Sequence, residues 1–325
     1  MQSGTDIFGV ANLAEARAIR SVGRGWPILM LGACLPEEVE TAVRDGVMPS
    51  LSSLDEARRV SQTAVKLNKT APVQIKVDTG MGRLGVPANE ACELIRQVMR
   101  LPNLVIQGLY THFSSTEDDA EFTRQQTAHF ERLLKELTAA QIPIPLIHFN
   151  NSGALLFERD HLHNAVRPGL LVYGIFPPGR RRVPEDWKNL VRPALSWKCR
   201  VSFVKAIPQG KTLSYGRTFT APKPMRVATL TAGYGDGYLR AGSNRAQVLI
   251  RGQRCPVVGR VTMDQMIADV SAVPDLVVGD EAVLIGAQGD QRITATELAE
   301  WFGTIPWEVL TNITYRVPRL YRGVE

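Results

Sequence analysis

The stretch VQIKVD at residues 73–78, continued by TGMGRLG at residues 79–85, indicates the fold of the first half of this 325-residue chain. Side chains alternate along a strand, so the valines and the isoleucine share one face, and Gln74, Lys76 and Asp78 share the other. In a barrel of parallel strands, one face packs against helices and the other points inward. Polar inward residues near the C-terminal end of such a strand predict a functional site there.

Short apolar runs alternate with helical patterns on both sides of this stretch. The alternation predicts a parallel sheet, and the number of units predicts a (β/α)8-type barrel. Seven strands can be counted where a closed barrel needs eight, so we expect an α/β fold whose barrel is missing its first strand. The predicted strands span residues 7–11, 28–31, 47–51, 73–77, 105–111, 146–150 and 165–167, and the predicted helices span 13–21, 36–45, 53–67, 88–100, 120–141 and 153–157.

The composition changes near residue 177, where prolines and an arginine triplet at 180–182 interrupt the alternation. Beyond this point the helical patterns nearly stop, and Gly and Pro separate short apolar runs, which is typical of β structure. We therefore expect two domains, an incomplete barrel at residues 1–185 and a mostly β domain at 186–325. The expected strands of the second domain are 199–207, 226–231, 246–250, 255–261 and 281–285, and its one expected helix is 294–302.

The overall composition excludes several classes of protein. Hydrophobic residues make up 44% of the chain and charged residues 22%, which fits a globular enzyme. The net charge is +6, but the arginine triplet has no interleaved aromatic residues, so no nucleic-acid partner is expected. No apolar run is long enough to cross a membrane, and the N-terminus does not resemble a signal peptide. The four widely spaced cysteines predict free thiols in a reducing compartment, with no metal site and a cytoplasmic location.

Two segments near the end of the expected barrel indicate a phosphate site. The run NNSG at 150–153 opens a helix, and backbone N–H groups at a helix start together with the Ser152 hydroxyl can hold an anion. The run RPGL at 167–170 follows the next strand and adds Arg167 just before Gly169. Loops after the last two barrel strands often hold phosphate. Taken singly, an ordinary N-cap at Ser152 and a surface arginine at a turn are the alternatives.

Three further residues at strand ends are candidates for the same site. Arg83 lies in a loop with three glycines in six residues, which indicates a shaped loop, with surface salt bridging as the alternative. His112 ends one expected strand and His148 lies in the next. A lone histidine in a barrel is more often a hydrogen-bonded core group, but two at neighbouring strand ends favour a functional role.

Two tyrosines in glycine-rich turns are candidate proton shuttles. Tyr215 lies in the run SYGRTF at 214–219, and Tyr234 lies in GYGDGY at 233–238. The alternative for each is an aromatic residue on the edge of a β-hairpin.

Taken together, these motifs resemble those of alanine racemases, pyridoxal-phosphate enzymes built of a barrel and a β domain. The resemblance covers essentially the whole chain, and it is specific because so many motifs occur together. The motifs are DTGMGRLG at 78–85, YTHF at 110–113, HFNNSGA at 148–154, VRPGLLVYG at 166–174, LSYGRTF at 213–219, GYGDGY at 233–238, VGRVTMDQ at 258–265 and TYRVPR at 314–319.

The resemblance implies that L- and D-alanine are interconverted by two-base proton transfer on a pyridoxal-phosphate aldimine, which supplies D-alanine for peptidoglycan. Tyr215 would be the base that acts on the L-amino acid, and it would reach the barrel of the other subunit of a homodimer. Arg167 would face the pyridine nitrogen, and a guanidinium that keeps its protons limits carbanion build-up. His112 would link Arg167 to Tyr215, and Tyr234 would line the substrate entrance.

The resemblance also implies a set of binding residues. Arg83 would contact the cofactor's phenolic oxygen and the substrate carboxylate. Lys76 matches a position that carries a carbamate in many members and would brace Arg83. Met263 and Asp264 of the partner subunit would border the substrate. The cofactor, with its phosphate, would be held by Asn151, Ser152, His148, Tyr315 and the backbone of Gly169 and Leu170.

Two expected residues, the family's Schiff-base lysine and a nearby pocket tyrosine that contacts the phosphate, have no match. The family's Schiff-base lysine ends the first barrel strand, and Lys76 does not replace it because its motif position belongs to the bracing role. We therefore expect a shortened form whose own activity is doubtful. The alternatives are a catalytically dead racemase-like protein and a serine racemase of the same fold.

Overall fold

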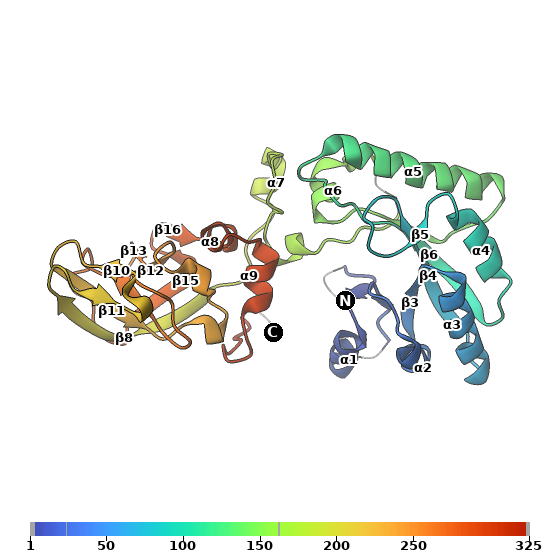
Figure 1. The fold of residues 1–325 in the computed structure, drawn as a ribbon. Coiled ribbons are helices and arrows are strands. Elements are labelled where there is room, and N and C mark those ends of the chain that lie inside the picture. The colour runs from blue at the N-terminus through green and yellow to red at the C-terminus, as the bar shows by residue number, and fades with distance from the viewer. Residues whose placement is uncertain (1–3, 24, 162, 323–325) are drawn as a thin grey trace. The chain divides into compact units, whose positions relative to one another are not determined.

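The computed structural model describes residues 4–23, 25–161 and 163–322, and its chain packs into two units (Figure 1). Unit 1 comprises Met1–Gly169 and Gly179–Pro184, and unit 2 comprises Leu170–Pro178 and Glu185–Glu325. Residues 170–178 therefore pack within unit 2 before the chain returns to unit 1 for a short stretch. Among the described residues, no helix combines the length and apolar character needed to cross a membrane.

Unit 1 contains a curled parallel sheet that follows the order of the chain. The predicted seventh strand is reduced to a single bridge between His148 and Ala165. The parallel α/β architecture predicted from the sequence is confirmed, with six strands in continuous order. These strands are β1 (Phe8–Val10), β2 (Ile28–Met30), β3 (Val47–Leu51), β4 (Ala71–Asp78), β6 (Leu104–Tyr110) and β7 (Leu146–His148), with the short β5 (Val86–Pro87) beside β4.

The helices of unit 1 begin where the sequence offers N-caps. Asn12 accepts a hydrogen bond from the Glu15 backbone and caps α1, which begins at the predicted residue 13. Ser53 and Glu56 form a capping box at the start of α3. The helices are α1 (Leu13–Val22), the 3-10 turn η1 (Pro36–Glu38) with α2 (Val39–Asp45), α3 (Leu54–Lys66), α4 (Ala91–Met99), α5 (Ala120–Ala139) and α6 (Ser152–Phe157), followed by the 3-10 turn η2 (Arg159–His161).

The two faces of β4 have the environments that the sequence predicts. Val73, Ile75 and Val77 are fully buried in one hydrophobic cluster with residues of α4 and α5, including Ile95 and Phe130. The polar residues of the opposite face are therefore directed into the interior of the curled sheet, toward the ends of β6 and β7.

Unit 2 is built on an antiparallel sheet, which confirms the mostly β second half. Its strand order is β13 (Gln253–Pro256), β12 (Gln247–Ile250), β15 (Glu281–Gln288), β8 (Trp197–Ile207), β11 (Met225–Leu230) and β14 (Met266–Asp269), with β16 (Gln291–Ile293) beside β15. A separate hairpin pairs β9 (Thr212–Leu213) with β10 (Phe219–Thr220). The 3-10 turns of unit 2 are η3 (Leu170–Tyr173), η4 (Tyr215–Arg217), η5 (Tyr234–Asp236) and η6 (Arg240–Gly242).

Unit 2 differs from the prediction in its number of helices, in the end of one strand, and in the short strands β9, β10, β14 and β16, which were not predicted. Besides α8 (Ala295–Phe302), unit 2 contains α7 (Glu185–Lys188) and α9 (Pro306–Asn312), so the prediction of a single helix was wrong. Pro306 occupies the first turn of α9, where its missing N–H costs no hydrogen bond. The strand expected at 255–261 ends at Pro256, because the chain turns at Gly259 with φ +79° before β14 begins.

Candidate functional site

The carboxyl ends of β4, β6 and β7 place Lys76, Tyr110 and His148 in one row. In the parallel register Lys76 lies opposite Tyr110, and Tyr110 lies opposite His148. The Tyr110 ring stacks on the His148 imidazole with a centroid distance of 4.8 Å and an interplanar angle of 5°. The Lys76 ammonium lies 5.3 Å from the centroid of the same ring. The three adjacent strands therefore place the Lys76 ammonium and the His148 imidazole against the buried Tyr110 ring.

Arg167 joins this row from the segment after the bridge at Ala165. Its Nη1 lies 2.5 Å from His148 Nδ1, and its Nη2 donates to the Thr111 carbonyl at 2.7 Å. The Nη2 atom also lies 3.4 Å from His112 Nδ1. The guanidinium carbon is 5.1 Å from the Tyr110 ring centroid. The structure thus brings Arg167 and both predicted histidines together, with the shorter contact to His148. We call Lys76, Tyr110, His112, His148 and Arg167 the strand-end cluster.

The strand-end cluster carries a surplus of positive charge. Burial, followed by the charges of Arg167 and Lys76, lowers the pKa of His148 to about 2. Burial and then the charges of Arg167, Lys76 and Arg83 lower the pKa of His112 to about 3. Burial also lowers the pKa of Lys76 to about 8, with Arg167 acting in the same direction. Both histidines are therefore neutral at physiological pH, and the cluster suits an anionic ligand.

The loop that carries Arg83 is shaped by the carboxylate at the end of β4. Asp78 Oδ1 accepts hydrogen bonds from the backbone of Gly80 at 2.9 Å and of Gly82 at 3.1 Å. Burial opposes ionisation of Asp78, but these backbone hydrogen bonds and the Lys76 charge outweigh it and lower the Asp78 pKa. Arg83 itself is exposed on this loop. The prediction of a shaped loop is thus supported by its hydrogen bonds.

The phosphate candidates divide between the two units. In unit 1, Ser152 Oγ accepts a hydrogen bond from the Gly169 backbone at 2.9 Å, so these two predicted residues meet. The N-cap of α6 is Asn151, which accepts from the Ala154 backbone, and not Ser152 as the ordinary alternative supposed. In unit 2, Leu170 is buried in the core, and Tyr315 is 97% exposed.

Tyr215 lies in the 3-10 turn η4, between the strands of the β9–β10 hairpin. The preceding Ser214 has φ +60° and donates its hydroxyl to the Arg260 carbonyl at 2.6 Å. This bond ties the turn to the loop between β13 and β14. The Tyr215 side chain is 72% exposed within the single chain.

The other predicted residues of unit 2 are connected through the same loop. The Tyr234 backbone donates to the Thr262 carbonyl, and the next backbone N–H donates to the Met263 carbonyl at 2.8 Å. Arg316 donates to Asp264 at 2.7 Å and lies 3.4 Å from Asp236. Hydrogen bonds thus connect the segments that carry Tyr215, Tyr234, Met263, Asp264 and Tyr315.

Comparison with known proteins identifies relatives of the chain. The model of the alanine racemase N-terminal domain matches residues 1–177, and that of the alanine racemase C-terminal domain matches residues 194–321. The chain is 40% identical over 326 residues to the alanine racemase of Halothermothrix orenii, covering 99% of this chain and 84% of that protein. The chain belongs to the alanine racemase family.

Solved structures of alanine racemases have the same fold. The enzyme of Clostridium difficile 630 is 32% identical with a TM-score of 0.89, covering 98% of this chain and 82% of that chain. The alanine racemase of Bartonella henselae, solved with covalently bound pyridoxal phosphate, is 29% identical with a TM-score of 0.85 over 98% of this chain and 86% of its own. By family, the chain is a pyridoxal-phosphate-dependent alanine racemase, and the serine racemase and catalytically dead alternatives are not favoured.

The residues of this alanine racemase fit the chemistry of pyridoxal phosphate, which carries a phosphate, a phenolic oxygen and a ring nitrogen. Arg167 has only donors, so it suits the ring nitrogen as a hydrogen-bond acceptor. Lys76 and Arg83 add positive charge near the same strand ends, which suits the anionic groups.

Sequence reasoning missed several residues that support the racemase site. Gln126 of α5 donates to Thr79 and to the His112 carbonyl, both at 3.2 Å, and Thr79 bonds Thr111 at 2.8 Å. Tyr110 begins the YTHF motif that contains His112, but only the strand register places its ring among the cations. No sequence pattern indicates these contacts in advance.

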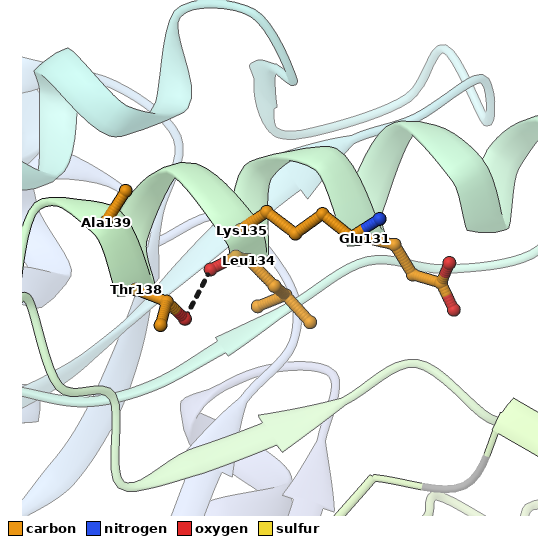
Figure 2. A pocket seen from close by; sticks show the side chains of 5 residues that line it. All are labelled: Glu131, Leu134, Lys135, Thr138 and Ala139. Atoms are coloured by element: carbon orange, nitrogen blue, oxygen red, sulfur yellow. Dashed lines mark hydrogen bonds between the residues drawn. The ribbon is translucent and has the colours of Figure 1, made fainter.

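Two hollows of the surface lie away from these residues. One, of about 590 Å³, lies on the C-terminal half of α5, where Figure 2 shows Thr138 bonded to the Leu134 carbonyl. The other, of about 190 Å³, lies within unit 2 among mostly apolar side chains, including Ile175, Leu195 and Ile293. Neither contains a residue of the predicted site.

Proposed function

We propose that this chain interconverts L- and D-alanine with pyridoxal 5'-phosphate, with Tyr215 as the base that acts on the L-isomer. The observation that carries the proposal is the strand-end cluster, in which a donor-only guanidinium lies against two neutral histidines. Bound pyridoxal phosphate supplies an electron-withdrawing ring that acidifies the α-hydrogen of an attached amino acid.

Arg167 sets the strength of that effect. Its hydrogen bond to the Thr111 carbonyl and its contact with His148 hold the guanidinium at the ends of β6 and β7. Burial lowers its pKa to about 10, so it remains protonated at neutral pH. It can donate a hydrogen bond to a ring nitrogen but does not hand over a proton, which disfavours reactions that need a protonated pyridine, such as transamination.

The binding roles follow from charge and position. Arg83 provides a cation for the substrate carboxylate and the phenolic oxygen of the cofactor, and Lys76 braces Arg83. Ser152 and the Gly169 backbone, already in contact, form one side of the phosphate site, and Asn151 holds the start of α6 beside them. We assign the remaining phosphate contacts to Leu170 and Tyr315, following the family resemblance.

We further propose a homodimer with shared active sites in the cytoplasm, where the four free cysteines stay reduced. A tyrosine acts as a base in its phenolate form, which nearby cations stabilise. Tyr215, Met263 and Tyr315 are all largely exposed in the single chain, as expected for residues that a partner covers. In this arrangement Tyr215 and the loop carrying Met263 and Asp264 complete the strand-end cluster of the partner, and Tyr234 lines the entrance.

The test of Tyr215 is α-hydrogen exchange. The protein is mixed with pyridoxal phosphate and L-alanine in deuterated water, loss of the α-proton signal is followed by NMR, and D-alanine is followed by chiral chromatography. We expect Tyr215→Phe to reduce the exchange by about a hundredfold or more, because a general base contributes about 10² to 10⁴. Tyr321→Phe, at an exposed tyrosine of the same unit, is the matched control. Equal exchange in the Tyr215→Phe and control variants would remove Tyr215 from the proposal.

A further inference from the structure

His148 is held at both ring nitrogens by side chains from different segments. Its Nε2 lies 2.6 Å from Gln74 Oε1, and its Nδ1 lies 2.5 Å from Arg167 Nη1. His148 is 2% exposed and Gln74 is fully buried. Solvent therefore does not compete for either nitrogen, and the two protein partners decide where the imidazole carries its proton.

The chemistry of the partners leaves one arrangement. A guanidinium has five donors and no acceptor, so His148 Nδ1 must accept from Arg167. A neutral imidazole has one N–H, which must then be on Nε2. Gln74 must consequently present its amide oxygen, because a flipped amide would set its NH₂ group against the Nε2–H. The orientation of Gln74 and the tautomer of His148 are thus fixed together.

The strand beside β4 leaves room for the Gln74 amide at the imidazole. Gly108 lies opposite Gln74 in the register of β4 and β6. A Cβ atom at position 108 would lie 2.9 Å from Gln74 Cδ and 3.0 Å from Gln74 Oε1, closer than such contacts normally are. The missing side chain at Gly108 therefore makes room for the amide beside the imidazole.

One face of the imidazole is covered by Tyr110. The Ser50 hydroxyl donates to the Met30 carbonyl at 2.7 Å, so the Tyr110 hydroxyl donates to Ser50, also at 2.7 Å. This chain of hydrogen bonds anchors the ring that stacks on His148. Because the ring plane of His148 is fixed, only its tautomer decides whether Nδ1 can accept the hydrogen bond from Arg167.

We propose that Gln74 is a positioning residue of the racemase site, which locks His148 as the Nε2–H tautomer and thereby holds the Arg167 guanidinium at the strand ends. The role of Arg167 toward the cofactor rests on the proposed function, whereas the tautomer does not. Holding His148 leaves Gln74 Nε2 without a hydrogen-bond partner among the described residues. An unsatisfied buried donor is costly, and positioning Arg167 gives a reason for it.

The experiment is long-range ¹H–¹⁵N NMR of the histidine side chains at neutral pH, with His148→Asn used to assign the signal. The wild type is expected to show His148 with a protonated Nε2 and an unprotonated Nδ1. Gln74→Leu leaves the buried Nε2–H without an acceptor, so we expect the Nδ1–H tautomer to appear and the contact with Arg167 to break. Gln125→Leu, at an exposed glutamine of α5 away from the site, is the control and keeps the wild-type pattern. An Nδ1–H tautomer in the wild type, or an unchanged pattern in Gln74→Leu, overturns the proposal.

A second variant keeps the test decisive if Gln74→Leu does not fold. Gln74→Glu has the same shape but places an anion against Nε2, which favours the imidazolium with both nitrogens protonated. Its Nδ1–H would then face Arg167, and the contact would break. A His148 signal in Gln74→Glu that is identical to the wild type contradicts the proposal.

The α-hydrogen exchange assay separates this inference from the proposed function. Displacement of Arg167 is expected to slow exchange by about tenfold to hundredfold in Gln74→Leu, since small misplacements at a reacting centre have effects of this size. If the wild type shows the Nε2–H tautomer but no exchange, the proposed function fails and the tautomer lock stands. If exchange is normal in a Gln74→Leu protein whose tautomer has changed, the positioning role is refuted.

Discussion

Single residues in the strand-end cluster explain how positive charge is concentrated without protonated histidines. Arg167 and Lys76 lie near the Tyr110 ring, and burial followed by their charges lowers the pKa of both histidines. A cationic imidazole would repel the guanidinium, whereas a neutral imidazole accepts a hydrogen bond from it. The histidines therefore act as acceptors that hold Arg167, and they do not carry charge themselves.

Acid should destabilise unit 1 through these two histidines. Their folded-state pKa values of about 2 and about 3 lie below the ordinary value of about 6.5. Below pH ~6.5 the unfolded chain therefore binds more protons, and the free energy of unfolding falls as the pH falls. We expect a slope of up to about 1.4 kcal/mol per pH unit for each histidine.

Urea unfolding between about pH 7.5 and pH 5.5 measures this slope, because ordinary carboxyl groups stay ionised there. His148→Asn should remove about half of the slope, and His129→Gln, at an exposed histidine of α5, is the control. Stability that is independent of pH over this range would contradict the neutral histidines.

Much of the cluster could be predicted at the residue scale, but its contacts could not. The alternation in residues 73–78 predicts which residues point inward, and the positions of His112, His148 and Arg167 at strand ends predict that they meet. The sequence does not contain the register that sets Arg167 closer to His148 than to His112. It also gives no reason to single out Gln74, whose role depends on a tautomer and on the space at Gly108.

Among the structural elements, the loop after β4 depends most on glycine. Gly82 has φ +69° with open space around it, whereas Gly85 has φ +121° and packs on the backbone. A Cβ at Gly85 would lie 2.6 Å from the Asp78 nitrogen and 2.7 Å from the Val77 carbonyl carbon. The two positions therefore separate the cost of a positive φ from the cost of a clash.

We expect Gly82→Ala to lower the stability of unit 1 by about 1 kcal/mol and Gly85→Ala by about 3 kcal/mol or more. The first shift corresponds to about 2–4 °C in Tm for a unit of this size. Thermal unfolding followed by circular dichroism measures both, with Gly82→Ala as the matched control for the left-handed conformation. Equal losses in the two variants would show that the backbone contact at Gly85 is unimportant.

Elements with a strong local signal were predicted well, and those set by tertiary contacts were not. Caps at Asn12 and Ser53 fix the starts of α1 and α3. The short strand β14 and the helix α9 were missed, because each is too short to show a clear period and is stabilised by its neighbours. The strand at 165–167 was overestimated for the same reason, since only one bridge forms there.

At the scale of the whole molecule, the predicted site residues are distributed over two units. Unit 1 carries Arg167, its histidines and the Ser152–Gly169 contact, and unit 2 carries Tyr215 with the loops of Tyr234 and Met263. The two matched family domains divide the chain in a similar way, at 1–177 and 194–321. Motif order along the chain could predict this division, whereas the pairing of units into a working site depends on the proposed dimer.

The most direct test of the account is complementation between two inactive variants. Tyr215→Phe lacks the base of unit 2, and Arg167→Gln lacks the guanidinium of unit 1. If each site draws Tyr215 from the partner subunit, a mixed dimer contains one intact site and one site with both defects. Random mixing of equal amounts should then restore about a quarter of the wild-type α-hydrogen exchange, because half of the dimers are mixed and each has one working site.

The two variants are co-expressed with different affinity tags, and the doubly tagged dimer is isolated. Its α-hydrogen exchange on L-alanine is then measured in deuterated water with pyridoxal phosphate. The account predicts that this dimer recovers about half of the wild-type rate per dimer, while each variant alone stays inactive. A doubly tagged dimer that remains as inactive as its parents would contradict the shared site and the role of Tyr215 in it.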